Sequence, residues 1–306
     1  MHPMTSDQTS KLSTPIGFIG IGNMGFAMMA RLLSQNWPVA VYDIDPIAMQ
    51  KAKSLGALVL KSPAQIAAQC KCTLVVVVDA PQVHQVLSGP EGYFSNARAG
   101  HSLFLCPTLS PLDVAHFAQQ AQVKAVDLID APMSGGPTRA REGEMSFMLA
   151  GAESVILAHT DLLNAITPNR FVISTTPGDA AKTKLANNLL AGIHLAGISE
   201  VLAMAQSWGL NAQTTLAVMQ ASSGQSWIGQ DRMQRALQND FEPRAHTTLL
   251  AKDTRLALEA CQAMSVKLPG LGVLATEQFA SACQNGFAHL DDASLFLQAG
   301  GKPVAE

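Results

Sequence analysis

The feature that most constrains the fold is the segment from Ile16 to Gln35, IGFIGIGNMGFAMMARLLSQ. It places a G-x-G-x-x-G motif between a short apolar run, typical of a buried strand, and a helical pattern. Glycines at such a turn let the backbone approach a pyrophosphate, while the helix N-terminus supplies amide donors. A glycine turn of purely structural use is the alternative. The motif predicts that a dinucleotide cofactor is bound by Gly20, Gly22, Asn23, Met24 and Gly25.

The next apolar run, VAVYD, ends in an acidic residue. Asp43 follows Gly25 by 18 residues, close to the spacing at which a carboxylate accepts hydrogen bonds from the adenosine ribose. A carboxylate repels a 2′-phosphate, and no arginine follows it in DIDPIAM. We therefore expect Asp43 to contact the cofactor and NAD to be preferred over NADP.

The first half of the chain alternates short apolar runs with helical patterns. A side chain that can cap a helix precedes proline at three expected helix starts, Asp45-Pro46, Ser62-Pro63 and Ser110-Pro111. Strand followed by helix, repeated, predicts a parallel sheet covered on both faces. The expected strands span residues 15–20, 39–43, 73–78, 102–106 and 123–129.

Beyond Pro177-Gly178 the pattern is helical throughout. A long helix is expected over 179–208, with shorter ones near 211–221, 225–239, 247–264, 270–285 and 291–298. We predict an α/β Rossmann-type NAD-binding domain with a parallel sheet over 15–178. An all-α substrate and dimerisation domain over 179–306 follows, joined to it through the long helix. Residues 1–14 are expected to form a disordered N-terminal extension.

Composition narrows the class of protein. The 306 residues carry a net charge of −3 without a dense Lys/Arg run, which argues against nucleic-acid binding. There is no secretory signal and no run of 18 apolar residues, so we expect no membrane span. Five cysteines without C-x-x-C spacing favour reduced thiols and a cytoplasmic location. Eight histidines without ligand spacing predict no metal, and His194, within an apolar helix, is interpreted as a packing residue.

Two polar side chains on the long helix are candidates for chemistry. Lys184 and Asn188 are four residues apart, so they share one helix face. A carbonyl that accepts hydride needs a proton donor near its oxygen, and a partly desolvated lysine can serve. Asn188 could hold the substrate oxygen or orient the lysine. The alternative is a solvated lysine on an exposed helix face.

A second candidate follows the expected strand 123–129. The segment DAPMSGG delivers Ser134, Gly135 and Gly136 to the carboxyl edge of the sheet, where open α/β folds bind ligands. A serine followed by two glycines can offer a hydroxyl beside exposed backbone amides, which suits a small carboxylate. A tight turn without a ligand is the alternative.

Four ordered segments together resemble the β-hydroxyacid dehydrogenase family: GFIGIGNMGFAMMARLL, DAPMSGG, GDAAKTKLANNLL and LLAKDTRLA. The resemblance implies that Lys184 is the catalytic acid/base, with Asn188 beside it, and that Ser134, Gly135 and Gly136 bind the substrate carboxylate. It also implies that two further residues, Thr108 and Lys252, contact the cofactor near its nicotinamide. By residue type alone, Lys252 and Asp253 would be an exposed charged pair. Pro107, where many relatives carry a hydroxyl residue, is a departure that affects the geometry beside Thr108.

These features predict an NAD-dependent dehydrogenase that interconverts a small 3-hydroxy carboxylate and its carbonyl form. The substrate would be of the 3-hydroxyisobutyrate, glycerate/tartronate semialdehyde or threonate type, and the enzyme a homodimer or homotetramer. Arg244 and His246 could approach the substrate, although a lone arginine is more often a surface residue. A non-catalytic NAD(P)-binding scaffold and an imine reductase of the same architecture are the alternatives; Lys184 argues for carbonyl chemistry.

Overall fold

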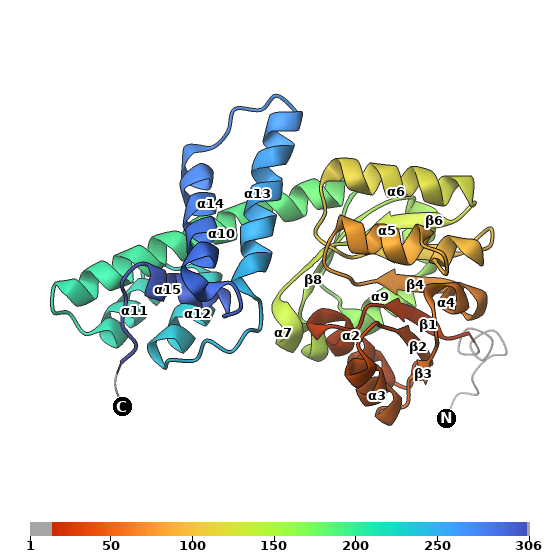
Figure 1. The fold of residues 1–306 in the computed structure, drawn as a ribbon, viewed down its shortest axis with the longest axis horizontal. Helices are drawn as coiled ribbons and strands as arrows, with labels where there is room; N and C mark the ends of the chain where they lie inside the picture. The colour runs from red at the N-terminus through yellow and green to blue at the C-terminus, as the bar shows by residue number, and fades with distance from the viewer. Residues whose placement is uncertain (1–13, 305–306) are drawn as a thin grey trace. The chain divides into compact units, whose positions relative to one another are not determined.

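The computed structural model describes residues 14–304, so nearly all of the predicted N-terminal extension lies outside the described residues. By internal packing the chain divides into two units between Lys184 and Leu185. The first unit is α/β and the second is helical (Figure 1). This agrees with the predicted fold class.

The described residues of the first unit form one nine-stranded sheet in the order β3-β2-β1-β4-β5-β6-β8-β7, with β9 paired to β8. Strands β1 to β6 are parallel to one another, as predicted. The order reverses between β1 and β4, which is the switch point where open α/β sheets bind ligands. The strands are β1 Ile16–Ile19, β2 Val39–Tyr42, β3 Leu58–Val59, β4 Cys72–Val75, β5 Ser102–Leu105, β6 Asp127–Asp130, β7 Met133–Ser134, β8 Ser146–Ala150 and β9 Arg170–Ser174.

Both faces of this sheet are covered by helices (Figure 1). Neighbouring residues of one strand face opposite layers, so Phe18 joins one core and Ile19 the other, and neither is exposed. One layer contains α2 Asn23–Ser34, α3 Pro46–Ser54, α7 Gly136–Glu142, α8 Glu153–Ala158 and α9 Thr160–Ile166. The other contains α4 Pro63–Gln69, α5 Ala80–Ser88, the 3₁₀ turn η1 Tyr93–Ser95 and α6 Pro111–Val123.

The three predicted helix caps are confirmed. Asp45 accepts a hydrogen bond from the Ile47 amide at the start of α3. Ser62 accepts from the Gln65 amide at the start of α4, and Ser110 accepts from the Asp113 amide at the start of α6. Each of the three capping residues precedes a proline. A side-chain acceptor satisfies one amide that the first helical turn leaves unpaired, and proline has no amide hydrogen to satisfy there.

The strand prediction was wrong at one place and incomplete at others. Val123 ends helix α6, and Ala125 turns the chain with a φ of 51°, so the strand expected over 123–129 begins only at Asp127. Strands β3, β7, β8 and β9 were not among the five expected strands. Strand β8 is antiparallel to β6 and β7, so the sheet is mostly rather than wholly parallel.

The second unit is helical, as predicted. Helix α10, Asp179–Ser207, enters it, and Leu195, Ile198 and Leu202 lie in its core. The helix expected over 270–285 ends at Ala282. A π-helical turn follows it, over Cys283–Phe287. The remaining elements are α11 Ala212–Gln220, α12 Trp227–Leu237, α13 Thr247–Ala263, α14 Gly270–Ala282, η2 Cys283–Phe287, η3 Asp292–Ser294 and α15 Leu295–Gln298.

Helix α10 combines a buried face with an exposed apolar one. Among the described residues it alone is long and apolar enough to cross a membrane, by length and composition only, and 44% of its most apolar stretch is buried in the single chain. Positions 190, 194, 197, 201 and 204 of α10, and Trp208 directly after its last residue, are all exposed and follow one another by four and three residues in turn. His194 belongs to this stripe, so it does not pack inside the single chain as expected. We call these six positions the α10 stripe.

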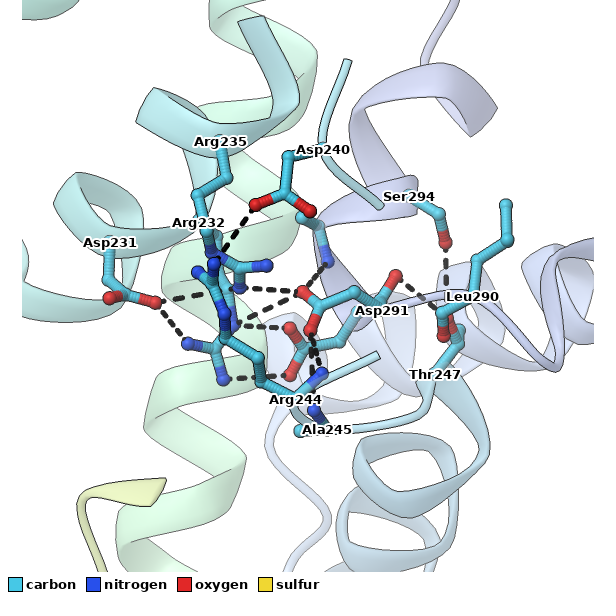
Figure 2. Close-up of polar contacts among 12 residues, drawn as sticks. Asp231, Arg232, Arg235, Asp240, Arg244, Ala245, Thr247, Leu290, Asp291 and Ser294 are labelled. Carbon is cyan, nitrogen blue, oxygen red and sulfur yellow. Dashed lines mark hydrogen bonds and ion pairs between the residues drawn. The ribbon is translucent and has the colours of Figure 1, made fainter. Parts of the chain in front are cut away.

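A buried ion network holds the second unit together (Figure 2). The carboxylate of Asp291 is fully buried and accepts a hydrogen bond from Arg235 at 2.8 Å and from the backbone amides of Arg244 and Ala245. Arg232 pairs with the neighbouring Asp292. Burial acts to raise the pKa of Asp291, but Arg235 and Arg232 outweigh it and hold that pKa below its ordinary value. The network therefore joins α12, the 240–246 loop and η3.

We expect Asp291→Ala to lower the free energy of unfolding by about 3–5 kcal/mol, because the buried Arg235 guanidinium loses its nearest carboxylate and the amides of Arg244 and Ala245 lose their acceptor. Asp240 provides a matched control. It pairs with Arg244 at 3.0 Å on the surface, so Asp240→Ala should cost less than about 1 kcal/mol. Urea denaturation of both variants measures the difference, and equal small losses would show that the buried network contributes little.

Candidate functional site

The carboxyl ends of the central parallel strands lie side by side. In the register of the sheet, Ile19 is paired with Tyr42 and with Val75, Val75 with Leu105, and Leu105 with Asp130. Two predicted site residues, Gly20 and Asp43, directly follow these positions, and Thr108 and Ser134 come three and four residues after Leu105 and Asp130. The topology thus brings the predicted residues of the first unit to one edge of the sheet.

Steric contacts require glycine at two positions of the turn, Gly20 and Gly25, but not at Gly22. Gly20 has a φ of 91°, and a β-carbon there would lie 2.6 Å from the carbonyl oxygen of Val76. A β-carbon at Gly25 would lie 2.2 Å from the carbonyl oxygen of Gly20, so this glycine lets α2 pack against the turn. At Gly22 a β-carbon would meet no atom within 4 Å. The space beside the backbone of Gly22 is therefore open.

These features fit a dinucleotide. Helix α2 begins at Asn23, and its first turn contains no acidic residue. The amides of Asn23, Met24 and Gly25 are the helix-start donors that lack an intrahelical partner by geometry. They could hold a pyrophosphate close to the backbone at Gly22. A nicotinamide dinucleotide bound here would supply hydride-transfer chemistry.

Asp43 has a second role that the sequence analysis missed. One carboxylate oxygen accepts a hydrogen bond from the Ile21 amide at 2.6 Å, and the other accepts from the Asp45 amide at 2.9 Å. Asp43 therefore braces the glycine turn. Each oxygen retains a second lone pair, so the partly exposed carboxylate can still accept from a ribose hydroxyl.

The predicted carboxylate receptor lies at a strand–helix junction rather than in a loop. Ser134 ends β7 and is paired with Ser146 of β8, and α7 begins at Gly136. Gly135 and Gly136 have φ values of 128° and 74°, which side-chain-bearing residues rarely adopt. A β-carbon at Gly136 would meet no atom within 4 Å, so the backbone there is open to a ligand.

The start of α10 is fixed by a residue that the sequence analysis did not single out. Asp130, the last residue of β6, is buried, and one of its oxygens accepts hydrogen bonds from the amides of Gly178 and Ala181 at 2.8 and 2.9 Å. Burial raises the pKa of Asp130 to about 6, although these amides act in the opposite direction. The sequence signal that could have identified Asp130 is an acidic residue at the end of an apolar strand.

Lys184 and Asn188 are both buried, each with 8% of its surface exposed. The alternative of a solvated lysine on an exposed helix face is therefore excluded. The neighbouring Lys182 shows the contrast, since it is exposed and pairs with Asp179 at 2.7 Å. Buried lysines are uncommon unless they are paired or functional.

The second unit joins Asn188 to the LLAKDT segment. The side-chain amide of Asn188 donates to Asp253 at 2.6 Å, and the other oxygen of Asp253 forms an ion pair with Lys252 at 3.2 Å. Asp253 is only 7% exposed and Lys252 is partly buried. The interpretation of these two residues as an exposed charged pair was therefore wrong. Asp253 is the functional candidate that residue type alone did not reveal.

Arg244 and His246 have local partners instead. Arg244 forms an exposed ion pair with Asp240, as expected for a surface arginine. His246 contacts the carbonyl oxygen of His289 through Nδ1 at 3.1 Å. In the part of the chain that the structure describes, no group of three or more His, Cys, Asp or Glu residues is arranged to hold a metal ion.

Comparison with known proteins gives consistent matches over both units. Residues 15–174 match the NAD-binding domain of 6-phosphogluconate dehydrogenase, and residues 178–297 match the NAD-binding domain of NADP-dependent 3-hydroxyisobutyrate dehydrogenase. L-threonate dehydrogenase of Cupriavidus necator is 30% identical over 285 residues, which are 93% of this chain and 95% of that protein.

Solved structures agree. The crystal structure of 3-hydroxyisobutyrate dehydrogenase from Salmonella typhimurium has a TM-score of 0.86 at 29% identity, covering 93% of this chain and 99% of that one. An imine reductase from Pseudomonas is more distant, with a TM-score of 0.64 at 18% identity over 94% of this chain and 99% of that one, and shows the fold alone. With its ordered motifs and these matches along the chain, the protein belongs to the β-hydroxyacid dehydrogenase family of NAD(P)-dependent oxidoreductases.

Proposed function

We propose that this protein oxidises the 3-hydroxyl group of a small carboxylate, and catalyses the reverse reduction, with NAD as the preferred cofactor. The observation that carries the proposal is the burial of Lys184 and Asn188 on one face of α10. Threonate and 3-hydroxyisobutyrate are the first substrates to test, because relatives along the whole chain are dehydrogenases named for these acids. We further propose that the enzyme is cytoplasmic.

Each predicted residue has a defined task in this reaction. Ser134 and the backbone at Gly135 and Gly136 bind the substrate carboxylate. In the oxidation, the amine of Lys184 takes the hydroxyl proton as the carbon loses hydride and the C–O bond becomes a carbonyl. A nicotinamide cofactor held at the glycine turn would supply the acceptor for that hydride. In the reduction, the Lys184 ammonium returns the proton to the oxygen.

Two alternatives make different predictions. An imine reductase would reduce a C=N bond and would not need the carboxylate receptor at Ser134–Gly136. A non-catalytic scaffold would bind the dinucleotide without turnover. Retention of a buried Lys184, a buried Asn188 and the glycine receptor favours the dehydrogenase.

We expect Lys184→Ala to lower kcat by about 10²-fold or more, because general acid–base catalysis is removed, while NAD still binds. Turnover is measured as reduced nicotinamide formed with D- and L-glycerate, 3-hydroxyisobutyrate and threonate. Lys182→Ala, two residues earlier on the same helix, is the matched control and should retain full activity. Equal activity of wild type and Lys184→Ala would refute the assignment of the acid.

Cofactor preference tests the role of Asp43. We expect the wild-type protein to bind NAD at least about tenfold more tightly than NADP, because the carboxylate repels a 2′-phosphate. In Asp43→Asn, the dissociation constants for NAD and NADP should become more similar. Titration of tryptophan fluorescence with each dinucleotide gives both dissociation constants. Tighter binding of NADP by the wild type would reverse our assignment.

The α10 stripe supports self-association. Leu190 is 53% exposed, and Val201, Met204 and Trp208 are more than two-fifths exposed in the single chain. Apolar side chains spaced by four and three residues form the seam through which helices pair. A second copy of the chain would cover this stripe, so we propose that the enzyme is a homodimer or homotetramer.

The double variant Val201→Glu/Met204→Glu should shift the protein to a monomer, because two carboxylates would be buried in the helix seam. Light scattering after size-exclusion chromatography gives the mass. Leu157→Glu, at an exposed apolar position on α8 in the other unit, should leave the mass unchanged. A wild-type protein that is monomeric at micromolar concentration would disprove the proposed interface.

A further inference from the structure

Asp253 is a buried carboxylate with two partners of different function. It accepts a hydrogen bond from Asn188, a predicted catalytic residue, and forms an ion pair with Lys252, a predicted cofactor contact. Its burial follows from its place on α13, since Leu250, Asp253, Thr254 and Ala257 form the buried face of that helix. A charged residue on such a face needs a reason, because burial of a carboxylate is costly unless it is paired.

The contact depends on a glycine where α13 packs against α10. Gly192 lies one turn after Asn188, and a β-carbon there would lie 2.8 Å from the γ-methyl group of Thr254, the residue after Asp253. Thr254 is fully buried, and its hydroxyl donates to the carbonyl oxygen of Leu250 at 2.9 Å, so this side chain is held in place. The glycine therefore allows the approach that brings Asp253 to Asn188.

The carboxylate of Asp253 also determines which atom of the Asn188 side-chain amide, nitrogen or oxygen, points away from Asp253. An ionised carboxylate only accepts hydrogen bonds, and Lys252 balances its charge, so the NH₂ group of Asn188 must point to Asp253. The oxygen of Asn188 then points elsewhere. It accepts from the side chain of Asn187 at 3.1 Å and keeps a second lone pair.

We propose that Asp253 is a positioning residue that fixes the Asn188 side chain as a hydrogen-bond acceptor in the active site. This inference rests on the proposed function, in which Asn188 lies beside the reacting hydroxyl group. An acceptor there can take a hydrogen bond from an ammonium group, whereas the single proton of the hydroxyl group goes to the lysine amine in the oxidation. With the amide reversed, Asn188 would present a donor and oppose the interaction with the ammonium group.

The test is Asp253→Asn, which keeps the shape but allows the Asn188 amide to turn. We expect kcat/KM for the hydroxy acid to fall about tenfold to a hundredfold, as for the loss of a hydrogen bond to a charged group. The thermal unfolding temperature should change little. Glu259→Gln is the matched control, because Glu259 forms an exposed ion pair with Arg255 on the same helix. It should behave as the wild type.

A double variant that exchanges the two residues, Asn188→Asp/Asp253→Asn, distinguishes an effect of amide orientation from an effect of packing. In this variant the amide introduced on α13 can donate to the carboxylate introduced on α10. That carboxylate again presents an acceptor to the active site, so the exchanged pair should recover at least about tenfold of the loss. Wild-type activity of Asp253→Asn would overturn the inference. An inactive single variant with no recovery in the exchanged pair would overturn it as well.

A failure of the proposed function can be recognised separately. If the wild-type protein oxidises none of the acids, the function is wrong, and the inference is judged on the unliganded protein. The variants Asn188→Ala, Asp253→Ala and their combination then form a double-mutant cycle in urea unfolding. Coupling equivalent to about tenfold or more in the unfolding equilibrium supports the contact, and additive effects contradict it.

Discussion

Helix α10 depends on two buried carboxylates, one in each unit. Asp130, at the end of β6, accepts hydrogen bonds from the first amides of the helix and so fixes where α10 begins relative to the sheet edge. Asp253 holds Asn188, two turns further along. Lys184 lies between these two points. The residue with the proposed chemistry thus belongs to a helix segment that is held at both ends by hydrogen bonds rather than by apolar packing alone.

The glycines of the chain serve three different purposes. Gly20 and Gly25 allow tight packing of the turn, whereas Gly22 and Gly136 leave space where a ligand can approach the backbone. Gly192 serves a third purpose, because it lets two helices approach until a carboxylate and an amide meet. In sequence all of these are the same residue. Only the atoms that a β-carbon would meet distinguish packing, binding and positioning.

Much of the fold could be predicted because the signals are local. The strand–glycine turn–helix segment, the caps at Asp45, Ser62 and Ser110, and the long apolar pattern after Gly178 each depend on neighbouring residues. Strand β8 was missed because its pairing with β6 and β7 is antiparallel and set by distant partners. Asp253 was misread because burial depends on α10, which lies more than 60 residues earlier in sequence. The assignments of the individual site residues remain predictions.

The central claim is that the amine of Lys184 exchanges a proton with the substrate hydroxyl group. A crystal structure of the enzyme with NAD and a hydroxy acid that it oxidises slowly tests this most directly. The account predicts that the nitrogen lies within hydrogen-bond reach of the hydroxyl oxygen, about 2.6–3.2 Å, with the carbon-bound hydrogen facing the nicotinamide ring. An amine turned away from the bound acid and into solvent would contradict it.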